Sequence, residues 1–173
     1  MNNIRLELLS EEHADVLFRF ETDNRGTFED ESFSRHPSYY ERNTFQEILE
    51  DLVEEQGQQL HAMYLVFNEE EELVGRVNLM KFVSEPFLKA EIGYLIDPTH
   101  QCKGYGTKAV RLLLEKAKNV YGLHRIESGT SPDNVAAQKV LMRNGFRHVG
   151  TYEQYIRVGE QWVDSSLYEK VLD

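Results

Sequence analysis

The sequence predicts a single α/β (α+β) domain, built on a mixed and mostly antiparallel central sheet that is flanked by helices. The chain has 173 residues, of which 40% are hydrophobic and 11% aromatic, enough to bury one core, and we expect one domain over 1–173. Three β-rich runs in the middle of the chain are separated by short turns, which favours antiparallel pairing. Segments of helical period alternate with strand-like segments on either side, which predicts helices on the faces of the sheet.

The strand-like segments carry alternating or β-branched apolar residues between turn residues. Alternation is clearest over Ile4–Leu8, where charged residues separate the apolar ones. The acidic run Glu69–Glu72 is expected to form a solvated hairpin tip, and Val158–Gln161 a second hairpin turn. The strands are expected at 4–8, 61–67, 73–83, 89–96 and 124–130, with two more within 146–172.

The helical segments carry apolar residues three and four positions apart. Ser10 can cap the first helix, which turn residues at 23–26 end. The segment 27–42 follows no regular period, and we expect it to be irregular. Thr44 and Glu47 have the spacing of a capping box, which predicts the start of the next helix. The later helices are expected from Thr44 to Gly57, from Thr107 to Tyr121 and from the turn at Ser131 to Asn144.

Charge and cysteine content exclude several functions. The 19 Lys and Arg against 30 Asp and Glu give a net charge of −11, a field that repels phosphate backbones and anionic lipids. We therefore expect no nucleic-acid partner and no membrane association. The lone Cys102 and six scattered histidines predict no disulfide framework and no metal site. The first residues lack the pattern of a signal peptide, and we expect a cytoplasmic protein.

The segment Ile96–Thr107 has the features of a pyrophosphate-binding turn. A strand ends, a loop containing Gly104 and Gly106 follows, and a helix begins. Backbone N–H groups then point outward at the positive end of the helix dipole, and Lys103 adds a formal charge. An ordinary strand-to-helix connection is the alternative interpretation. The Walker pattern and the three-glycine dinucleotide fingerprint are both absent.

On two motifs the sequence resembles the GNAT superfamily of acyl-CoA N-acyltransferases. Residues 101–106, Gln-Cys-Lys-Gly-Tyr-Gly, match its signature Gln/Arg-x-x-Gly-x-Gly/Ala. Residues 134–146 are similar to its second motif, an Asn-headed helix closed by Gly-Phe. Tyr155 and residues 159–164 resemble the branch that contains ribosomal-protein N-terminal alanine acetyltransferases. The resemblance covers nearly the whole chain.

The resemblance implies a binding mode for acetyl-CoA. The strands at Glu91–Ile96 and Ile126–Thr130 would splay apart, and the pantetheine arm would lie between them. Backbone groups near Leu95 and Ile96 would pair with the amides of that arm. The pyrophosphate would bind backbone N–H groups of Gln101, Cys102, Lys103, Gly104, Tyr105, Gly106 and Thr107.

The second motif would add two contacts to the cofactor. The resemblance implies that Asn134 hydrogen-bonds the pantetheine arm and that Lys139 can reach a phosphate. The alternatives are that Asn134 only caps its helix and that Lys139 is a solvated helix lysine.

The resemblance also implies direct attack of a neutral amine on the thioester carbonyl. Glu91 is the candidate base, acting through water, and a cross-strand or surface carboxylate is the alternative interpretation. Many superfamily members place a tyrosine acid where this chain has Leu141. The proton donor is therefore open between Tyr94, Tyr155 and water.

The acceptor is expected to be an amine. The resemblance favours a protein N-terminus, while a polyamine or another small amine are alternatives that also suit the net charge of −11. Deprotonation at pH 7 costs ~1.1 kcal/mol for a peptide α-amine and ~4.6 kcal/mol for a lysine or polyamine amine. The acceptor groove is expected between 23–40 and the hairpin at 155–162. A homodimer is a further expectation, and a catalytically silent CoA-binding module is the alternative of another class.

Overall fold

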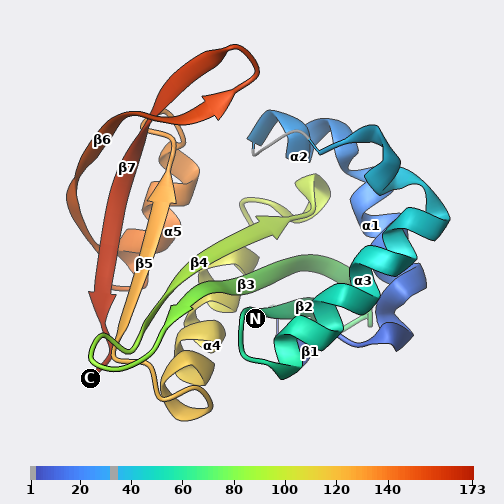
Figure 1. Ribbon diagram of the computed structural model, residues 1–173, viewed down its shortest axis with the longest axis horizontal. Coiled ribbons are helices and arrows are strands. Elements are labelled where there is room, and N and C mark those ends of the chain that lie inside the picture. The colour runs from blue at the N-terminus through green and yellow to red at the C-terminus, as the bar shows by residue number, and fades with distance from the viewer. Residues whose placement is uncertain (1–2, 32–34) are drawn as a thin grey trace.

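Figure 1 shows the computed structural model, which describes residues 3–31 and 35–173. Among these residues, seven strands form one sheet in the order β1-β2-β3-β4-β5-β7-β6. Neighbouring strands are antiparallel except for β4 and β5, which run parallel. The mixed and mostly antiparallel sheet expected from the sequence is confirmed.

The strands lie within a few residues of their predicted positions. They are β1 (Ile4–Leu8), β2 (Ala62–Asn68), β3 (Leu73–Val83), β4 (Lys89–Ile96), β5 (Arg125–Thr130), β6 (Arg147–Val158) and β7 (Gln161–Val171). The helices are α1 (Ala14–Asp23), α2 (Arg25–Glu31), α3 (Arg42–Gly57), α4 (Tyr105–Asn119) and α5 (Val135–Arg143). Short 3₁₀ turns are η1 (Glu11–His13), η2 (Pro37–Tyr40) and η3 (Pro98–His100).

The expectation of an irregular segment at 27–42 was wrong. Helix α2 overlaps the start of this segment and the turn η2 lies inside it. Phe28 of α2 is buried. The Phe28 ring packs against that of Phe20 on α1, with ring centroids 5.3 Å apart. A single buried aromatic anchors the short helix, so no helical period is visible in the sequence.

The predicted capping box at Thr44 was also wrong. Helix α3 begins at Arg42, and its N-cap is Glu41, whose carbonyl accepts a hydrogen bond from Phe45 N at 2.9 Å. The guanidinium of Arg42 lies over the ring of Phe18 on α1, 5.0 Å from its centroid. This contact between helices stabilises an earlier start than the local pattern indicates.

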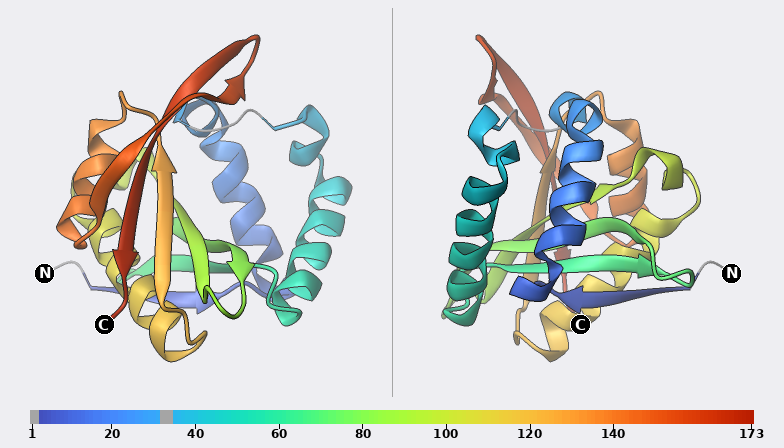
Figure 2. Two further views of the ribbon diagram at one scale, coloured as in Figure 1. Left: turned by 60° about the vertical axis from the view of Figure 1, so that its left-hand side comes forward. Right: turned by 90° about the vertical axis from the view of Figure 1, so that its right-hand side faces the viewer.

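Two hydrophobic layers cover opposite faces of the sheet (Figure 2). Helix α4 packs on one face through Val110 and Leu113, and α1 and α3 pack on the other through Leu17 and Leu49. Every residue of β2 is buried, because its alternate side chains enter both layers. The outer hairpin of β6 and β7 extends beyond the layers (Figure 2).

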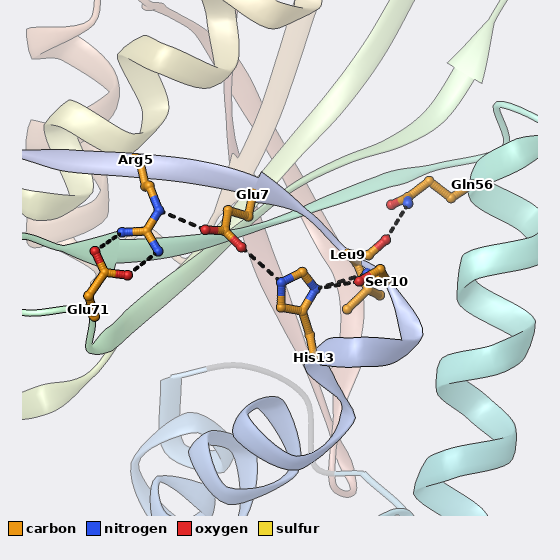
Figure 3. A network of polar contacts seen from close by, with 7 residues as sticks. All are labelled: Arg5, Glu7, Leu9, Ser10, His13, Gln56 and Glu71. Carbon is orange, nitrogen blue, oxygen red and sulfur yellow. Dashed lines mark hydrogen bonds and ion pairs between the residues drawn. The ribbon is translucent and has the colours of Figure 1, made fainter.

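A polar network ties β1 to the turn before α1 and to the β2–β3 hairpin (Figure 3). The guanidinium of Arg5 donates to Glu7 Oε1 at 2.7 Å and to Glu71 Oε1 at 2.8 Å. Glu7 Oε2 lies 3.0 Å from His13 Nε2, and His13 Nδ1 accepts a hydrogen bond from Ser10 N at 3.0 Å. The hydrogen bonds from His13 and then Arg5 lower the pKa of Glu7 below its usual value.

Candidate active site

Strands β4 and β5 pair only over a short stretch before they separate. Their register has three parallel positions, the last of which joins Glu91 and Glu127. Both strands continue, β4 as far as Ile96 and β5 as far as Thr130, and Figure 1 shows them diverging. The splayed strand pair expected from the sequence is confirmed.

The backbone direction of β4 decides which groups face the side where β5 has diverged. The carbonyl of Ile92 accepts a hydrogen bond from Ser128 Oγ on β5 at 3.3 Å, so it points toward β5. Backbone groups alternate in direction along a strand, so those of Tyr94 and Ile96 point the same way. Those of Leu95 point toward β3. Of the two residues predicted near the pantetheine arm, Ile96 therefore has the suitable direction.

The loop after β4 has the shape of an anion-binding turn. Gly104 is the N-cap of α4 with a φ of +87°, and it has no side chain to cap the helix. The first N–H groups of α4, which have no acceptor within the helix, therefore point outward. A Cβ built on Gly104 would meet nothing within 4 Å, so the turn faces open space. The exposed Cys102 also has a left-handed φ of +59°.

The other loop residues differ in what they can offer a ligand. Tyr105 and Gly106 are buried, and as the first residues of α4 their backbone N–H groups have no acceptor within the helix. The side chain of Gln101 donates to the carbonyl of Ile96 at 3.3 Å, which holds the loop against the end of β4. Lys103 is exposed. The carbonyl of Thr107 accepts a hydrogen bond at 3.1 Å from the side-chain amide of Asn144, the C-cap residue of α5.

The second motif lies on α5, beside this loop. Asn134 Oδ1 caps the helix by accepting a hydrogen bond from Ala137 N at 3.0 Å, which is compatible with both interpretations of this residue. Lys139 is exposed. Leu141 belongs to the core, where it is 1% exposed. The hydroxyl of Tyr94 reaches α5 from β4 and donates to Ala137 O at 3.4 Å.

Lys81, which the sequence did not indicate as a site residue, interacts with both catalytic candidates, Glu91 and Tyr155. Glu91 Oε2 is 2.8 Å from Lys81 Nζ. The hydrogen bond with Glu91 raises the pKa of Lys81, and the nearby Tyr155 phenol contributes in the same direction. Tyr155 is exposed on β6, with its ring centroid 4.7 Å from that of Tyr152. Lys81 was missed because strand periodicity places residues 80 and 81 on opposite faces.

Two buried serines near the separated strands were also missed. Ser128 holds the carbonyl of Ile92, as described above. The hydroxyl of Ser165 on β7 is buried and has no hydrogen-bond partner in the described part of the chain. It lies 2.8 Å from the position that a Cβ on Gly129 would take. Sequence alone carries no signal for these hydroxyls, because serine is as common on a solvated face.

Within residues 3–31 and 35–173, no group of three or more His, Cys, Asp or Glu side chains could hold a metal ion. In the same part of the chain, no helix combines the length and the apolar character needed to cross a bilayer. Residues 32–34 of the predicted acceptor segment lie outside the described residues.

Parallel strands that separate, with outward N–H groups at the following helix start, fit a class of proteins that bind an elongated, phosphate-bearing ligand along a strand. A family model described as an acetyltransferase (GNAT) domain matches residues 3–147. The chain belongs to this family and is an acetyl-CoA-dependent N-acetyltransferase.

Similar proteins support the family assignment and show the fold. The chain is 32% identical over 151 residues to a probable N-acetyltransferase, YjcK, of Bacillus subtilis, covering 85% of this chain and 82% of that protein. The ribosomal-protein-S5-alanine acetyltransferase of Vibrio fischeri superposes with a TM-score of 0.92 at 24% identity, covering 100% and 97% of the two chains. The Vibrio cholerae spermidine N-acetyltransferase, solved with CoA and spermine, superposes with a TM-score of 0.83 at 18% identity over 98% and 95%.

Proposed function

We propose that this N-acetyltransferase acetylates a protein N-terminal α-amine. The observation that carries the proposal is the charge balance beside the separated strands. Glu91, Glu127 and Glu169 lie in register across β4, β5 and β7, and therefore share one face of the sheet. Each of these carboxylates already has a cationic partner, respectively Lys81, Lys89 and Arg147.

This balance favours an acceptor with a single amine at the reacting end. A polyamine carries several ammonium groups and needs several carboxylates without partners of their own. A peptide α-amine also needs little help in losing its proton, at ~1.1 kcal/mol at pH 7. The structural likeness to a ribosomal-protein alanine acetyltransferase suits the same acceptor class. A small amine or polyamine is the second candidate, because the likeness to a spermidine acetyltransferase is also high.

In the proposed reaction, the neutral amine attacks the carbonyl carbon of the thioester. A C–N bond forms and the C–S bond breaks, so that CoA leaves as a thiolate. The proton of the amine passes through water to Glu91, and Tyr155 gives the thiolate its proton. The half-exposed carboxylate of Glu91 lies where the two strands separate, which supports its role as the base.

The proposed cofactor site uses the groups that face open space. The N–H groups at the start of α4, from Gly104 onward, would bind the pyrophosphate, with Lys103 adding charge. The backbone of Ile96 would pair with the pantetheine arm. The amide nitrogen of Asn134, which has no partner within the described residues, would donate to the same arm, and Lys139 would reach a phosphate.

We also propose that the protein works in the cytoplasm, where an exposed free thiol such as that of Cys102 stays reduced. The acceptor is proposed to enter between the 23–40 segment and the β6–β7 hairpin. We propose in addition that the protein forms a homodimer, and analytical ultracentrifugation measures its oligomeric state by sedimentation.

An acetyl-transfer panel tests the acceptor. Acetyl-CoA is incubated with short peptides that begin with alanine, with the same peptides blocked at the N-terminus, with spermidine and with small amines. We expect thiol release and a mass gain of one acetyl group with the free peptides alone. Transfer to spermidine but to no free peptide would contradict the acceptor and leave the enzyme class intact. Cofactor binding without any transfer would support the silent CoA-binding module.

A further inference from the structure

The ion pair between Lys81 and Glu91 is not what a regular strand pair would form. Glu91 of β4 pairs in register with Met80 of β3, so these two side chains share a face. The next residue, Lys81, would then point to the opposite face. Its Nζ nevertheless lies 2.8 Å from Glu91 Oε2.

A β-bulge explains how Lys81 reaches Glu91. The β3–β4 register shifts between Met80 and Val83, and Lys81 has a left-handed φ of +52°. A lysine adopts this conformation only at a cost in conformational free energy. Bulges re-aim side chains next to active sites, and this bulge directs an ammonium onto the proposed base.

The ion pair between Lys81 and Glu91 is easier to break than the ion pair between Lys89 and Glu127 on the same face of the sheet. Lys89 lies near both carboxylate oxygens of Glu127, at 3.2 and 3.0 Å, and is 32% exposed. Lys81 is 65% exposed. Arg125 also donates to Glu127, whereas Lys81 is the partner that the described residues supply to Glu91. Releasing Lys81 therefore frees Glu91.

We propose that the ammonium of Lys81 occupies the position on Glu91 that the acceptor's ammonium takes when it first binds, before that ammonium loses a proton to solvent water and becomes the neutral amine that attacks. The acceptor must therefore displace Lys81. A protonated substrate amine has the same charge and the same three donors as lysine Nζ, so binding exchanges one ammonium for another. The inference rests on the proposed role of Glu91 and deepens it. Lys81 becomes a specificity-determining residue, because an amine held by further contacts displaces a tethered lysine and a small free amine does so poorly.

The titratable groups that face Lys81 are Glu91 and Tyr155. Both raise its pKa, so Lys81 stays an ammonium at neutral pH. A charged lysine is a competitor for the carboxylate and not a nucleophile toward the thioester.

The test compares three variants by their Michaelis constants. Lys81→Met should lower KM for an alanine-initiated peptide by about two- to fivefold, the range expected for loss of an exposed ion pair, and should leave KM for acetyl-CoA unchanged. Lys81→Arg should retain the wild-type KM. Lys89→Met removes the same charge from the same face and should leave KM for the peptide unchanged. An unchanged KM in Lys81→Met, or an equal fall in Lys89→Met, overturns the proposal.

A second measurement does not depend on transfer. The Nζ resonance of Lys81 is titrated in labelled protein with and without the same unmodified peptide, in the absence of acetyl-CoA, so that the peptide ammonium keeps its three donors and no transfer occurs. We expect the pKa of Lys81 to fall toward its ordinary value with the peptide, as it should in Glu91→Gln. A pKa that saturating peptide leaves unchanged overturns the displacement. If the proposed acceptor class is wrong, the wild-type protein will transfer acetyl to no peptide, a result that is distinct from an unchanged pKa of Lys81.

Discussion

Gly104 shows how much of the candidate site depends on one residue. Its φ of +87° turns the chain into α4, and its missing side chain leaves the first N–H groups of the helix uncapped. Serine and aspartate are the usual N-cap residues and would occupy those donors, but either would be strained at this left-handed φ. The glycine therefore favours an external anion at the expense of local helix stability.

Gly104→Asp should abolish the rise in melting temperature that acetyl-CoA causes in the wild type. A ligand at 100 times its Kd stabilises the native state by ~2.7 kcal/mol, and a carboxylate facing the pyrophosphate removes that binding. Gly122→Asp is the matched control, because Gly122 also has a left-handed φ, +61°, and open space around it. The control should retain the shift, and an equal shift in Gly104→Asp would rule out the loop as the phosphate site.

Glu91→Gln should lower kcat at neutral pH and recover part of it at alkaline pH, where the amine loses its proton unaided. A general base contributes on the order of 10²-fold or more, and a peptide α-amine needs less of that help, so we expect a fall of about tenfold. Initial rates across pH measure the effect. Glu69→Gln, at the exposed β2–β3 turn, is the control, and a wild-type pH profile in Glu91→Gln would remove Glu91 from the mechanism.

At the scale of elements, the β6–β7 hairpin supplies a matched pair of tyrosines. Tyr152 and Tyr155 are exposed to similar extents, 50% and 49%, and their rings contact each other. If Tyr155 protonates the leaving thiolate, Tyr155→Phe should lower kcat on the order of 10²-fold, while Tyr152→Phe should not. Single-turnover thiol release measures the step. Equal rates in the two variants would exclude Tyr155 as the proton donor. Tyr94 would then be the next candidate, and Tyr94→Phe tests it in the same assay.

The network around Glu7 joins β1 to two other elements and makes their attachment pH-dependent. The pKa of Glu7 is lowered in the folded state, so its stabilisation is present above the ordinary glutamate pKa of 4.5 and is lost as the pH falls through the folded value. The side chain is partly exposed, so the contribution is about 1 kcal/mol or less. Urea unfolding of wild type and Glu7→Gln at several pH values should show a difference at neutral pH that vanishes in acid.

On the scale of the whole molecule, a buried ion pair links the helical layer to the sheet. Arg76 Nε of β3 donates to Glu21 Oε1 of α1 at 2.5 Å, and both residues are buried. Arg35 lies 3.9 Å from the other oxygen of Glu21 and stacks on Tyr39. Burial, followed by the charge of Glu21, raises the pKa of Tyr39 to about 12. The pair thus anchors the segment before α3 beside the sheet.

Breaking this pair from one side should be costly. Glu21→Met leaves the Arg76 guanidinium buried without its carboxylate, and we expect a loss of ~3–5 kcal/mol in the free energy of unfolding. The double variant Glu21→Met with Arg76→Met removes both charges and should lose less than the single one. Denaturant unfolding of the double variant and of each single variant, Glu21→Met and Arg76→Met, measures the coupling. A double variant that loses as much as the sum of the single changes would show that the two charges are not coupled.

The sequence by itself determined the strand positions, the mixed sheet and the loop between β4 and α4. These features depend on local chemistry: alternation places the strands, and the glycine at position 104 places the turn. The start of α5 at Asn134 is of the same kind, because an asparagine cap acts on residues within one turn of itself. The cofactor and catalytic roles of the named residues stay predictions.

Tertiary structure alone decided which of these residues meet. Helix α2 is anchored by Phe28, α3 begins early at Arg42, and a bulge brings Lys81 onto Glu91. Each depends on a partner on another helix or strand, and the local preferences that the sequence does carry are worth only fractions of a kcal/mol to ~1 kcal/mol per residue. Local patterns carry no record of such partners, because periodicity describes which face a residue occupies and not what packs against that face.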